Sequence, residues 1–262
     1  MKGYYTLGRY PGCEDATMNV WKTLVTALAR GKVHMTLLDP DKLPPADIAK
    51  ICADAEGMGT DAIMLGGSTG ITVENLDRAI VAIKERTSLP VILFPMGAKA
   101  LSGKADAIYF MSLMNSRNLR FVVGEQVAGA PVIKALGLEP ISMGYIIVEP
   151  GMKVGEVGEA DPVPRAEPKK AVAQALATQY FGMKLVYLEA GSGAHSPVPG
   201  EMVSAVKKAV SIPVVVGGGV RTPEQARELA GAGADILVTG TLAEDSAQGA
   251  DLAGVIRAFK GM

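Results

Sequence analysis

The sequence predicts a single domain over residues 1–262, an α/β fold of the (β/α)8 or TIM barrel type. Eight short apolar runs suited to strands alternate with segments of helical periodicity in nearly every case, which favours one closed parallel sheet. A chain of 262 residues, 48% of them hydrophobic, has the size of one such barrel and can bury a large core. The two apolar runs between Val214 and Thr241 also each end in a glycine loop, as the last two barrel strands commonly do.

The first half of the chain supplies an extra N-terminal helix and four strands. Apolar residues recur at helical spacing from Glu14 to Arg30 and Gly31 ends the pattern, so we expect a helix that covers the lower end of the barrel. The expected strands are 33–38, 61–68 together with its loop, 90–95, and one within 105–113. The expected helices follow the first two strands and end at 57–59 and 87.

The third helix of the barrel is predicted to be missing. Between the third and fourth strands lies only Met96 to Lys104, which contains two glycines and is too short for a covering helix. We expect irregular chain there instead. Part of the barrel wall would then be uncovered, leaving an opening in which a long apolar ligand could lie.

The second half of the chain completes the barrel. The expected strands are 140–151, 185–194, 214–219 and 236–241, and the expected helices are 119–136, 169–181, 200–210, 222–230 and 248–259. A Gly- and Pro-rich loop, 152–168, follows the fifth strand, and a loop of that length in a compact domain is more often functional than decorative. The turn Gly57-x-Gly59-x-Asp61 has a counterpart in Gly231-x-Gly233-x-Asp235, which we interpret as recurring turn chemistry rather than a duplicated half.

Composition points to a small-molecule substrate and a cytoplasmic protein. Lys+Arg 26 and Asp+Glu 27 give a net charge of -1, so no basic field favours nucleic acid. Cys13 and Cys52 lack metal-ligand spacing, and the N-terminus has no signal-peptide pattern. No apolar run reaches the roughly 18 to 20 residues of a transmembrane helix. We expect any lipid substrate to be met from the aqueous side.

The glycine loops predict a phosphate site. Parallel strands of a barrel end on one face, so Gly217-Gly218-Gly219 and Gly240-Thr241 should be neighbours there. Their free backbone N–H groups would bind a phosphate.

Asp39 is a candidate Mg²⁺ ligand. It follows the first strand directly, and Mg²⁺ commonly takes one or two carboxylates plus water and substrate phosphates. Asp39 with the Ser68 hydroxyl would suit Mg²⁺ held mainly by a diphosphate. A simple turn at Asp39-Pro40-Asp41 with side-chain caps is the alternative. Lys42 either contacts a phosphate or is solvated.

Glu189 is the candidate general base, because burial at the end of an apolar strand would raise its pKa. The alternative is a structural carboxylate paired with Lys or Arg inside the barrel. Tyr187 points the same way and either packs or holds a substrate oxygen. We expect His34 to be structural and His195, in a loop of the catalytic face, to bind no metal. The methionines from Met111 to Met114 either pack in the core or line a prenyl groove.

Several motifs, in order along almost the whole chain, resemble those of the geranylgeranylglyceryl phosphate synthases, which share a fold with the bacterial heptaprenylglyceryl phosphate synthases. The motifs are 38–42 (LDPDK), 66–68 (GGS), 112–116 (SLMNS), 144–151 (GYIIVEPG), 187–193 (YLEAGSG), 217–219 (GGG) and 240–241 (GT). The YLEAGSG strand and the long EPG loop are similar to the second of the family's two groups. A missing third helix is also a family trait.

The resemblance implies a prenyltransferase of archaeal-type ether-lipid and phospholipid biosynthesis. It would join the C3 hydroxyl of sn-glycerol 1-phosphate to geranylgeranyl diphosphate and release diphosphate, as a Mg²⁺-dependent homo-oligomer, a dimer or a hexamer. Asp39 and Ser68 match the family's metal positions, and Glu189 the residue thought to hold or deprotonate the attacking hydroxyl. The residues that match its glycerol-phosphate site are Tyr187, Leu188, Glu189, Ala190, Gly191, Ser192, Gly193, Gly217, Gly218, Gly219, Gly240 and Thr241.

Other functions fit the sequence less well. A prenyl donor of another length would keep the same mechanism. A phosphate-binding isomerase or synthase of histidine or tryptophan biosynthesis shares the phosphate loops, but such enzymes generally use a carboxylate pair or a Cys/Asp set. A non-catalytic carrier would need neither a metal carboxylate nor a base.

Overall fold

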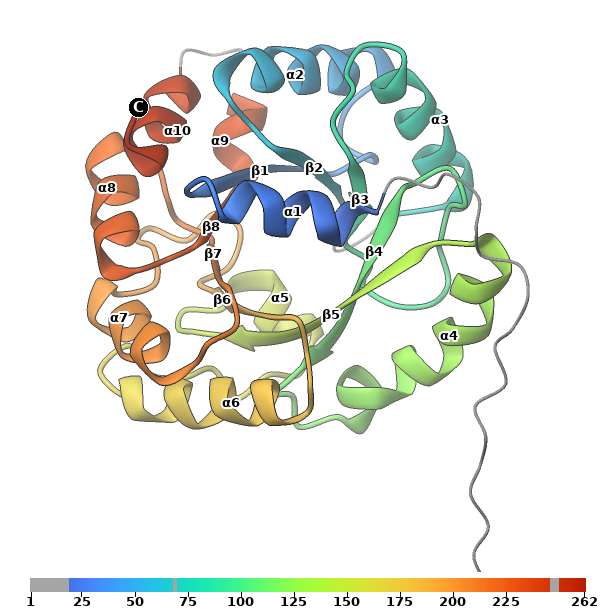
Figure 1. Ribbon diagram of the computed structural model, residues 1–262. Coiled ribbons are helices and arrows are strands. Elements are labelled where there is room, and N and C mark those ends of the chain that lie inside the picture. Colours follow the sequence, from blue (N-terminus) through green and yellow to red (C-terminus); the bar gives the residue numbers. More distant parts are fainter. Residues whose placement is uncertain (1–18, 68–69, 246–249) are drawn as a thin grey trace, which may run out of the picture.

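Eight parallel strands close into a barrel in chain order in the computed structural model, which describes residues 19–67, 70–245 and 250–262 (Figure 1). The strands are β1 (Val33–Leu38), β2 (Ala62–Leu65), β3 (Val91–Leu93), β4 (Ala107–Leu113), β5 (Glu139–Ile147), β6 (Leu185–Glu189), β7 (Val214–Gly217) and β8 (Ile236–Thr239). Pairing of β1 with β8, for example Met35 with Val238, closes the sheet. The predicted TIM barrel is confirmed.

Helices surround the barrel. They are α1 (Val20–Leu28), α2 (Pro45–Met58), α3 (Val73–Lys84), the π-helical turn η1 (Arg120–Gly124), α4 (Glu125–Leu136), α5 (Met152–Val157), α6 (Pro168–Tyr180), α7 (Gly200–Ala209), α8 (Pro223–Ala232), α9 (Thr241–Glu244) and α10 (Leu252–Lys260). No helix among them could span a membrane.

The strands divide the core into two layers, because successive side chains of a strand point to opposite faces. Met35, Met64 and Tyr109 belong to the cluster that fills the barrel, whereas Leu38, Ile63 and Ile108 pack outward against the helices. Because the strands are buried on both faces, their sequences are apolar at nearly every position.

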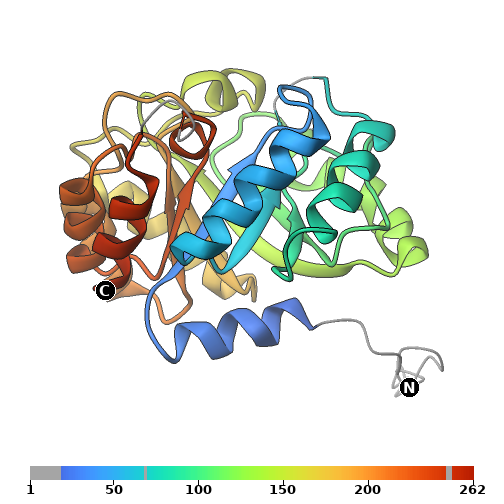
Figure 2. The same cartoon turned by 90° about the horizontal axis from the view of Figure 1, so that it is seen from above.

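The N-terminal helix α1 lies across the lower end of the barrel, as expected (Figure 2). The carboxylate of Glu139, the first residue of β5, accepts hydrogen bonds from the backbone N–H groups of Val20 at 2.6 Å and Trp21 at 3.2 Å. N–H groups of the first helical turn have no partner within the helix, and a carboxylate there also interacts favourably with the helix dipole. Of the predicted helix, residues 14–18 lie outside the described residues.

The segment between β3 and β4 contains no helix, which confirms the predicted loss of the third barrel helix. The sequence did not predict two short helices and one distortion. The loop after β5 contains α5, the loop after β8 contains α9, and the helix after β4 begins with the π-helical turn η1. Four to six residues are too few for a periodic pattern, so tertiary contacts, such as Gly151 N–H to the Ala190 carbonyl at 3.1 Å, determine these elements.

The recurring turn pattern has a common structural role. Gly59 and Gly233 end their helices with the same φ of 104°. The following aspartates, Asp61 and Asp235, each accept a hydrogen bond of 2.8 Å from a backbone N–H at the start of a neighbouring strand. Asp61 pairs with Lys260 at 2.9 Å and Asp235 with Lys207 at 2.6 Å. Asp106 repeats the arrangement with Lys84. The interpretation as shared turn chemistry agrees with these contacts.

Candidate functional site

A cavity of about 370 Å³ opens at the carboxyl ends of the strands, within the size range of small-molecule sites. The predicted site residues that line it are Asp39, Tyr187, Glu189, Ser192, Gly193, Gly218, Gly219, Gly240 and Thr241. Residues from β1, β6, β7 and β8 therefore meet on one face, as the barrel register predicted.

Three loops form the predicted phosphate seat, which we define as residues 191–193, 217–219 and 240–241. Gly218 and Gly219 have φ of 80° and 74°, values that disfavour any side chain. A Cβ on Gly218 would lie 2.4 Å from Glu189 Oε1, and one on Gly219 would lie 2.5 Å from the Ser196 carbonyl oxygen. Glycine therefore lets these loops approach one another closely. The hydroxyls of Ser192 and Thr241 are 3.2 Å apart and join the loops after β6 and β8.

The side chains of Leu188 and Ala190 face away from the cavity. Both belong to the core layer between sheet and helices, because they alternate with Tyr187 and Glu189 along the strand. Only backbone atoms of these two predicted residues can serve a ligand.

Glu189 is buried at the cavity floor, and its Oε1 accepts the Gly191 N–H at 2.7 Å. Burial raises its pKa, and the hydroxyls of Tyr187 and Tyr145 and the Gly191 N–H oppose that shift. No Lys or Arg forms an ion pair with Glu189 in the described part of the chain. The geometry thus favours a base over a structural ion pair.

Tyr187 both packs and presents a buried polar atom. Its ring lies 5.1 Å from that of Tyr145 and 5.9 Å from that of Phe94, centre to centre. Its hydroxyl is buried and makes no hydrogen bond of good geometry with the described residues. Burial, then the Glu189 carboxylate, raises the pKa of this phenol well above 10. A buried hydroxyl beside both the Glu189 carboxylate and the cavity is suited to a substrate oxygen.

Asp39 lines the cavity and forms an ion pair of 2.6 Å with Lys42. Lys42 also lies 3.3 Å from Glu244 of α9, and its side chain is 48% exposed, so it is solvated as well as paired; a contact with a phosphate stays a prediction. Burial raises the pKa of Asp39, and the Lys42 ammonium opposes this shift. Ser68 lies outside the described residues. Three or more metal-ligating side chains do not cluster anywhere in the described ranges, so a cation here would depend on substrate oxygens.

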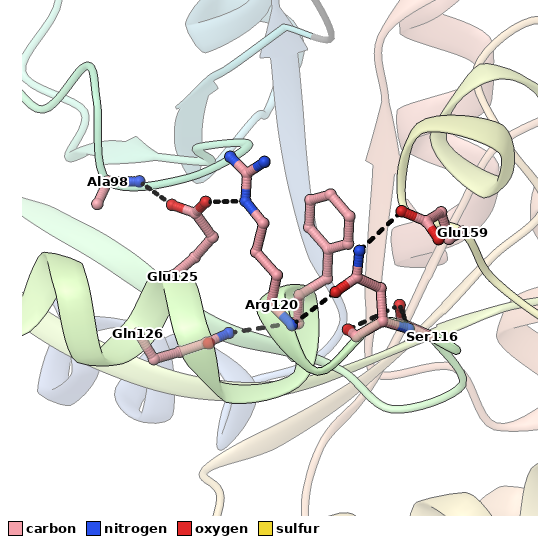
Figure 3. Close-up of polar contacts among 8 residues, drawn as sticks. Ala98, Ser116, Arg120, Glu125, Gln126 and Glu159 are labelled. Atoms are coloured by element: carbon pink, nitrogen blue, oxygen red, sulfur yellow. Dashed lines mark hydrogen bonds and ion pairs between the residues drawn. The ribbon is translucent and has the colours of Figure 1, made fainter.

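The cavity continues sideways to the wall left open after β3. Phe121, Gln126, Gly129 and Ile133 line it there. The Glu125 carboxylate bridges this region, accepting from Arg120 Nε at 2.5 Å and from the Ala98 N–H at 2.7 Å (Figure 3).

The Gln126 side-chain amide donates to the Met111 carbonyl and, at 3.3 Å, to the Phe121 carbonyl. Along the apolar part of the cavity, the Glu125–Ala98 hydrogen bond thus ties the start of α4 to the β3–β4 connection, and the Gln126 amide ties it to β4 and η1.

The other residues singled out from the sequence, two of them methionines, contribute to the core. His34 is buried between the Thr60 and Thr239 hydroxyls at 2.8 and 3.0 Å, and burial lowers its pKa to about 3. Met111 packs against the inner core layer and also lines the cavity, and Met114 packs against the outer layer. Burial raises the pKa of Cys52 to about 12, and Cys13 is outside the described residues.

Sequence reasoning missed Tyr145, Phe94 and Glu244. Tyr145 alternates inward with Met143 and Ile147, so the period of two along β5 could have identified it. Glu244 depends on the position of α9, which leaves no pattern in the sequence.

Comparison with known proteins matched this chain to one family model and to several relatives that share one name. The model of the PcrB family matches residues 26–259. A geranylgeranylglyceryl phosphate synthase of Thermococcus gammatolerans is 57% identical over 217 residues, covering 83% of this chain and 86% of that protein. One of Thermoplasma acidophilum is 52% identical over 229 residues, covering 87% and 90%.

Solved structures agree. The crystal structure of (S)-3-O-geranylgeranylglyceryl phosphate synthase from Thermoplasma acidophilum in complex with substrate sn-glycerol-1-phosphate has a TM-score of 0.90 at 49% identity, covering 94% of this chain and 100% of that one. Tryptophan synthase subunit alpha from Legionella pneumophila, with a TM-score of 0.59 at 16% identity over 93% of this chain and 98% of that one, shares the fold alone.

Proposed function

The chain belongs to the PcrB family, and on this basis we propose that it is a geranylgeranylglyceryl phosphate synthase. The reaction joins the C3 hydroxyl of sn-glycerol 1-phosphate to C1 of geranylgeranyl diphosphate through an ether bond and releases diphosphate. The observation that carries the proposal is the juxtaposition of a glycine-lined phosphate seat with a buried carboxylate, Glu189, in one cavity. It is supported by 57% identity to a relative of that name.

The phosphate seat is assigned to the phosphate of sn-glycerol 1-phosphate. Residues 191–193, 217–219 and 240–241 offer backbone N–H groups there, and the Ser192 and Thr241 hydroxyls add donors. Fixing the phosphate at one end of a three-carbon molecule leaves the hydroxyl at its other end near Glu189. Such fixation makes the attack effectively intramolecular, which lowers the barrier by ~7 kcal/mol or more in well-aligned cases.

Glu189 is assigned as the general base, and Tyr187 as the residue that orients it and the substrate hydroxyl. A carboxylate whose pKa is raised by burial binds a proton more strongly than a solvated one, which helps it take the proton of an attacking hydroxyl. The Gly191 N–H holds Glu189 Oε1 in place. The second carboxylate oxygen is then available to the substrate.

Asp39 is assigned to Mg²⁺, together with Ser68. Asp39 fits the ion, because this partly buried carboxylate borders the cavity and a hard cation needs oxygen donors that a diphosphate also supplies. When bound, Mg²⁺ would stabilise the charge on the leaving diphosphate. Lys42, now paired with Asp39 and Glu244, supplies positive charge at the same place.

The prenyl tail is assigned to the sideways part of the cavity, whose lining residues Phe121, Gly129 and Ile133 are mostly apolar. This placement would let a cytoplasmic enzyme hold a C20 chain away from water while its diphosphate remains at the polar mouth.

Diphosphate release from purified protein tests the proposal. The reaction contains Mg²⁺, sn-glycerol 1-phosphate and prenyl diphosphates of increasing length, with sn-glycerol 3-phosphate as control. Release that peaks at the C20 donor and requires the 1-phosphate is expected. A peak at a longer donor would change the product but not the mechanism, and no release with any donor would refute the assignment.

A further inference from the structure

We propose that Glu244 is a positioning residue that couples the two substrate subsites. It fixes the loop after β1, which carries Asp39 and Lys42, to the loop after β8, which is part of the phosphate seat. The two substrates then bind cooperatively. This inference rests on the proposed function, because the two subsites are the ones assigned there.

Glu244 lies where the loops after β1 and β8 meet. Its Oε1 and Oε2 are 3.4 and 3.3 Å from Lys42 Nζ, and the same ammonium pairs with Asp39 at 2.6 Å. Lys42 therefore lies between two carboxylates. Burial raises the pKa of Glu244, and the Lys42 ammonium and the Asp39 backbone N–H oppose this shift. Glu244 is thus close to both residues of the loop after β1 that have an assigned role.

The helix α9 connects Glu244 to the phosphate seat. Its first residue, Thr241, belongs to the seat, and the Thr241 hydroxyl lies 3.2 Å from that of Ser192. The N–H groups of Ala243 and Glu244 donate to the Gly240 carbonyl at 2.8 and 3.1 Å. Glu244 is therefore one helical turn from the residues that would hold the glycerol phosphate.

The helix α9 is too short to hold its position alone. Helix nucleation is unfavourable, and isolated helices of fewer than ~12 residues are marginal even in favourable sequences. Leu242 and Ala243 bury their side chains, and α9 lies beside β1 (Figure 1). Glu244 adds a polar contact that reaches the loop beyond β1. The ion pair with Lys42 thus orders α9 and that loop together.

The Lys42–Glu244 pair is better suited to positioning than to stabilising the fold. The Lys42 side chain is about half exposed, and ion pairs in contact with water contribute little to stability. Asp39, Lys42 and Glu244 all line the cavity, so the pair lies beside the assigned diphosphate. Without Glu244, the flexible four-carbon stem of Lys42 would keep one partner, Asp39, three positions away.

Two subsites that share an ordered element affect each other's affinity. A ligand that orders shared structure loses conformational entropy, and a second ligand then binds with a smaller loss. sn-Glycerol 1-phosphate on the seat orders α9 and, through Glu244, the loop that carries Asp39 and Lys42. The subsite assigned to Mg²⁺ and diphosphate is then already in place. By thermodynamic linkage the coupling is reciprocal.

Isothermal calorimetry tests this coupling without turnover. The Kd of sn-glycerol 1-phosphate is measured with Mg²⁺ alone and with Mg²⁺ and saturating inorganic diphosphate. In the wild type, diphosphate should lower this Kd at least about fivefold, and in Glu244→Gln it should change the Kd less than about twofold. Glu167→Gln is the matched control and should keep the wild-type coupling. It removes a carboxylate 2.9 Å from Lys170, at the start of α6 and outside the cavity.

Three further measurements separate positioning from folding. Glu244→Gln should unfold within about 3 °C of the wild type, because a partly exposed ion pair contributes little to stability. In hydrogen exchange, sn-glycerol 1-phosphate should protect residues 38–42 in the wild type but not in the variant. Lys42→Met should also lose the coupling, and the double variant should lose no more than either single change.

The outcomes distinguish the inference from the function on which it rests. A wild-type protein in which diphosphate leaves the Kd of sn-glycerol 1-phosphate unchanged, or raises it, would overturn the coupling. Coupling retained in both Glu244→Gln and Lys42→Met would overturn the role of Glu244. A wild-type protein that binds no sn-glycerol 1-phosphate, or releases no diphosphate with any prenyl donor, would instead reject the proposed function.

Discussion

Replacing Glu189 by Gln should abolish most catalysis while preserving the fold. The two side chains have the same shape, and the Gln Oε1 can still accept the Gly191 N–H that Glu189 accepts at 2.7 Å. What is lost is the ability to take a proton from the substrate hydroxyl. General-base catalysis is typically worth 10²- to 10⁴-fold, or about 3 to 5 kcal/mol of barrier. We therefore expect kcat to fall by at least 100-fold and the KM for sn-glycerol 1-phosphate to change less than threefold.

The pH dependence sharpens this prediction. Since burial raises the pKa of Glu189, wild-type kcat should fall as the pH drops through that raised value, and the residual activity of the Gln variant should lack this limb. The contribution of Glu189 to folding stability changes with pH in the opposite direction to kcat. A carboxyl group whose pKa is higher in the folded state contributes stability below its unfolded pKa, and this contribution is lost as the pH rises through the folded pKa. At pH values above the raised pKa of Glu189, the variant should unfold at the same temperature as the wild type or a higher one.

The assay measures diphosphate release under saturating prenyl donor, isothermal calorimetry for sn-glycerol 1-phosphate, and thermal unfolding. Glu156→Gln, an exposed change on α5, is the control and should match the wild type in all three. A Glu189→Gln variant with kcat within tenfold of the wild type, but a much higher KM, would show that the carboxylate only binds. The base assignment would then be wrong.

Three other changes test the remaining assignments. Asp39→Asn should reduce turnover at least 100-fold and remove the Mg²⁺-dependent calorimetric binding of inorganic diphosphate, and retained binding would reject the metal assignment. Gly218→Ala should weaken sn-glycerol 1-phosphate binding at least tenfold because its Cβ would lie 2.4 Å from Glu189 Oε1, whereas Gly231→Ala, with open space around it, should not. In the wild type, stability should fall by about 1 kcal/mol per pH unit as the pH drops from 6.5 toward 3, because burial lowers the pKa of His34 to about 3 and the unfolded chain protonates first. In acid-unfolding curves, His34→Gln should lack this dependence of stability on pH. An unchanged slope in the variant would show that His34 is not its cause.

Long periodic elements and the glycine loops could be predicted from sequence because their signals are local. Strand β1 was predicted with its observed bounds, and the loss of the third barrel helix followed from counting the residues between β3 and β4. The short helices α5 and α9 could not be predicted, since tertiary contacts decide them. The same limit applies to the site. Glu189 follows from its strand, but the pairing of Lys42 with Glu244 joins residues 202 positions apart.

The aspartates that precede β2, β4 and β8 fix the strands at the lower end of the barrel, through hydrogen bonds to neighbouring backbones and ion pairs with lysines. The register of the sheet is therefore determined at the end opposite the cavity. Loops at the upper end are free to keep costly features, such as the positive-φ glycines, without loosening the sheet. In evolutionary terms, substrate preference can change by altering upper loops while the lower anchors preserve a foldable protein.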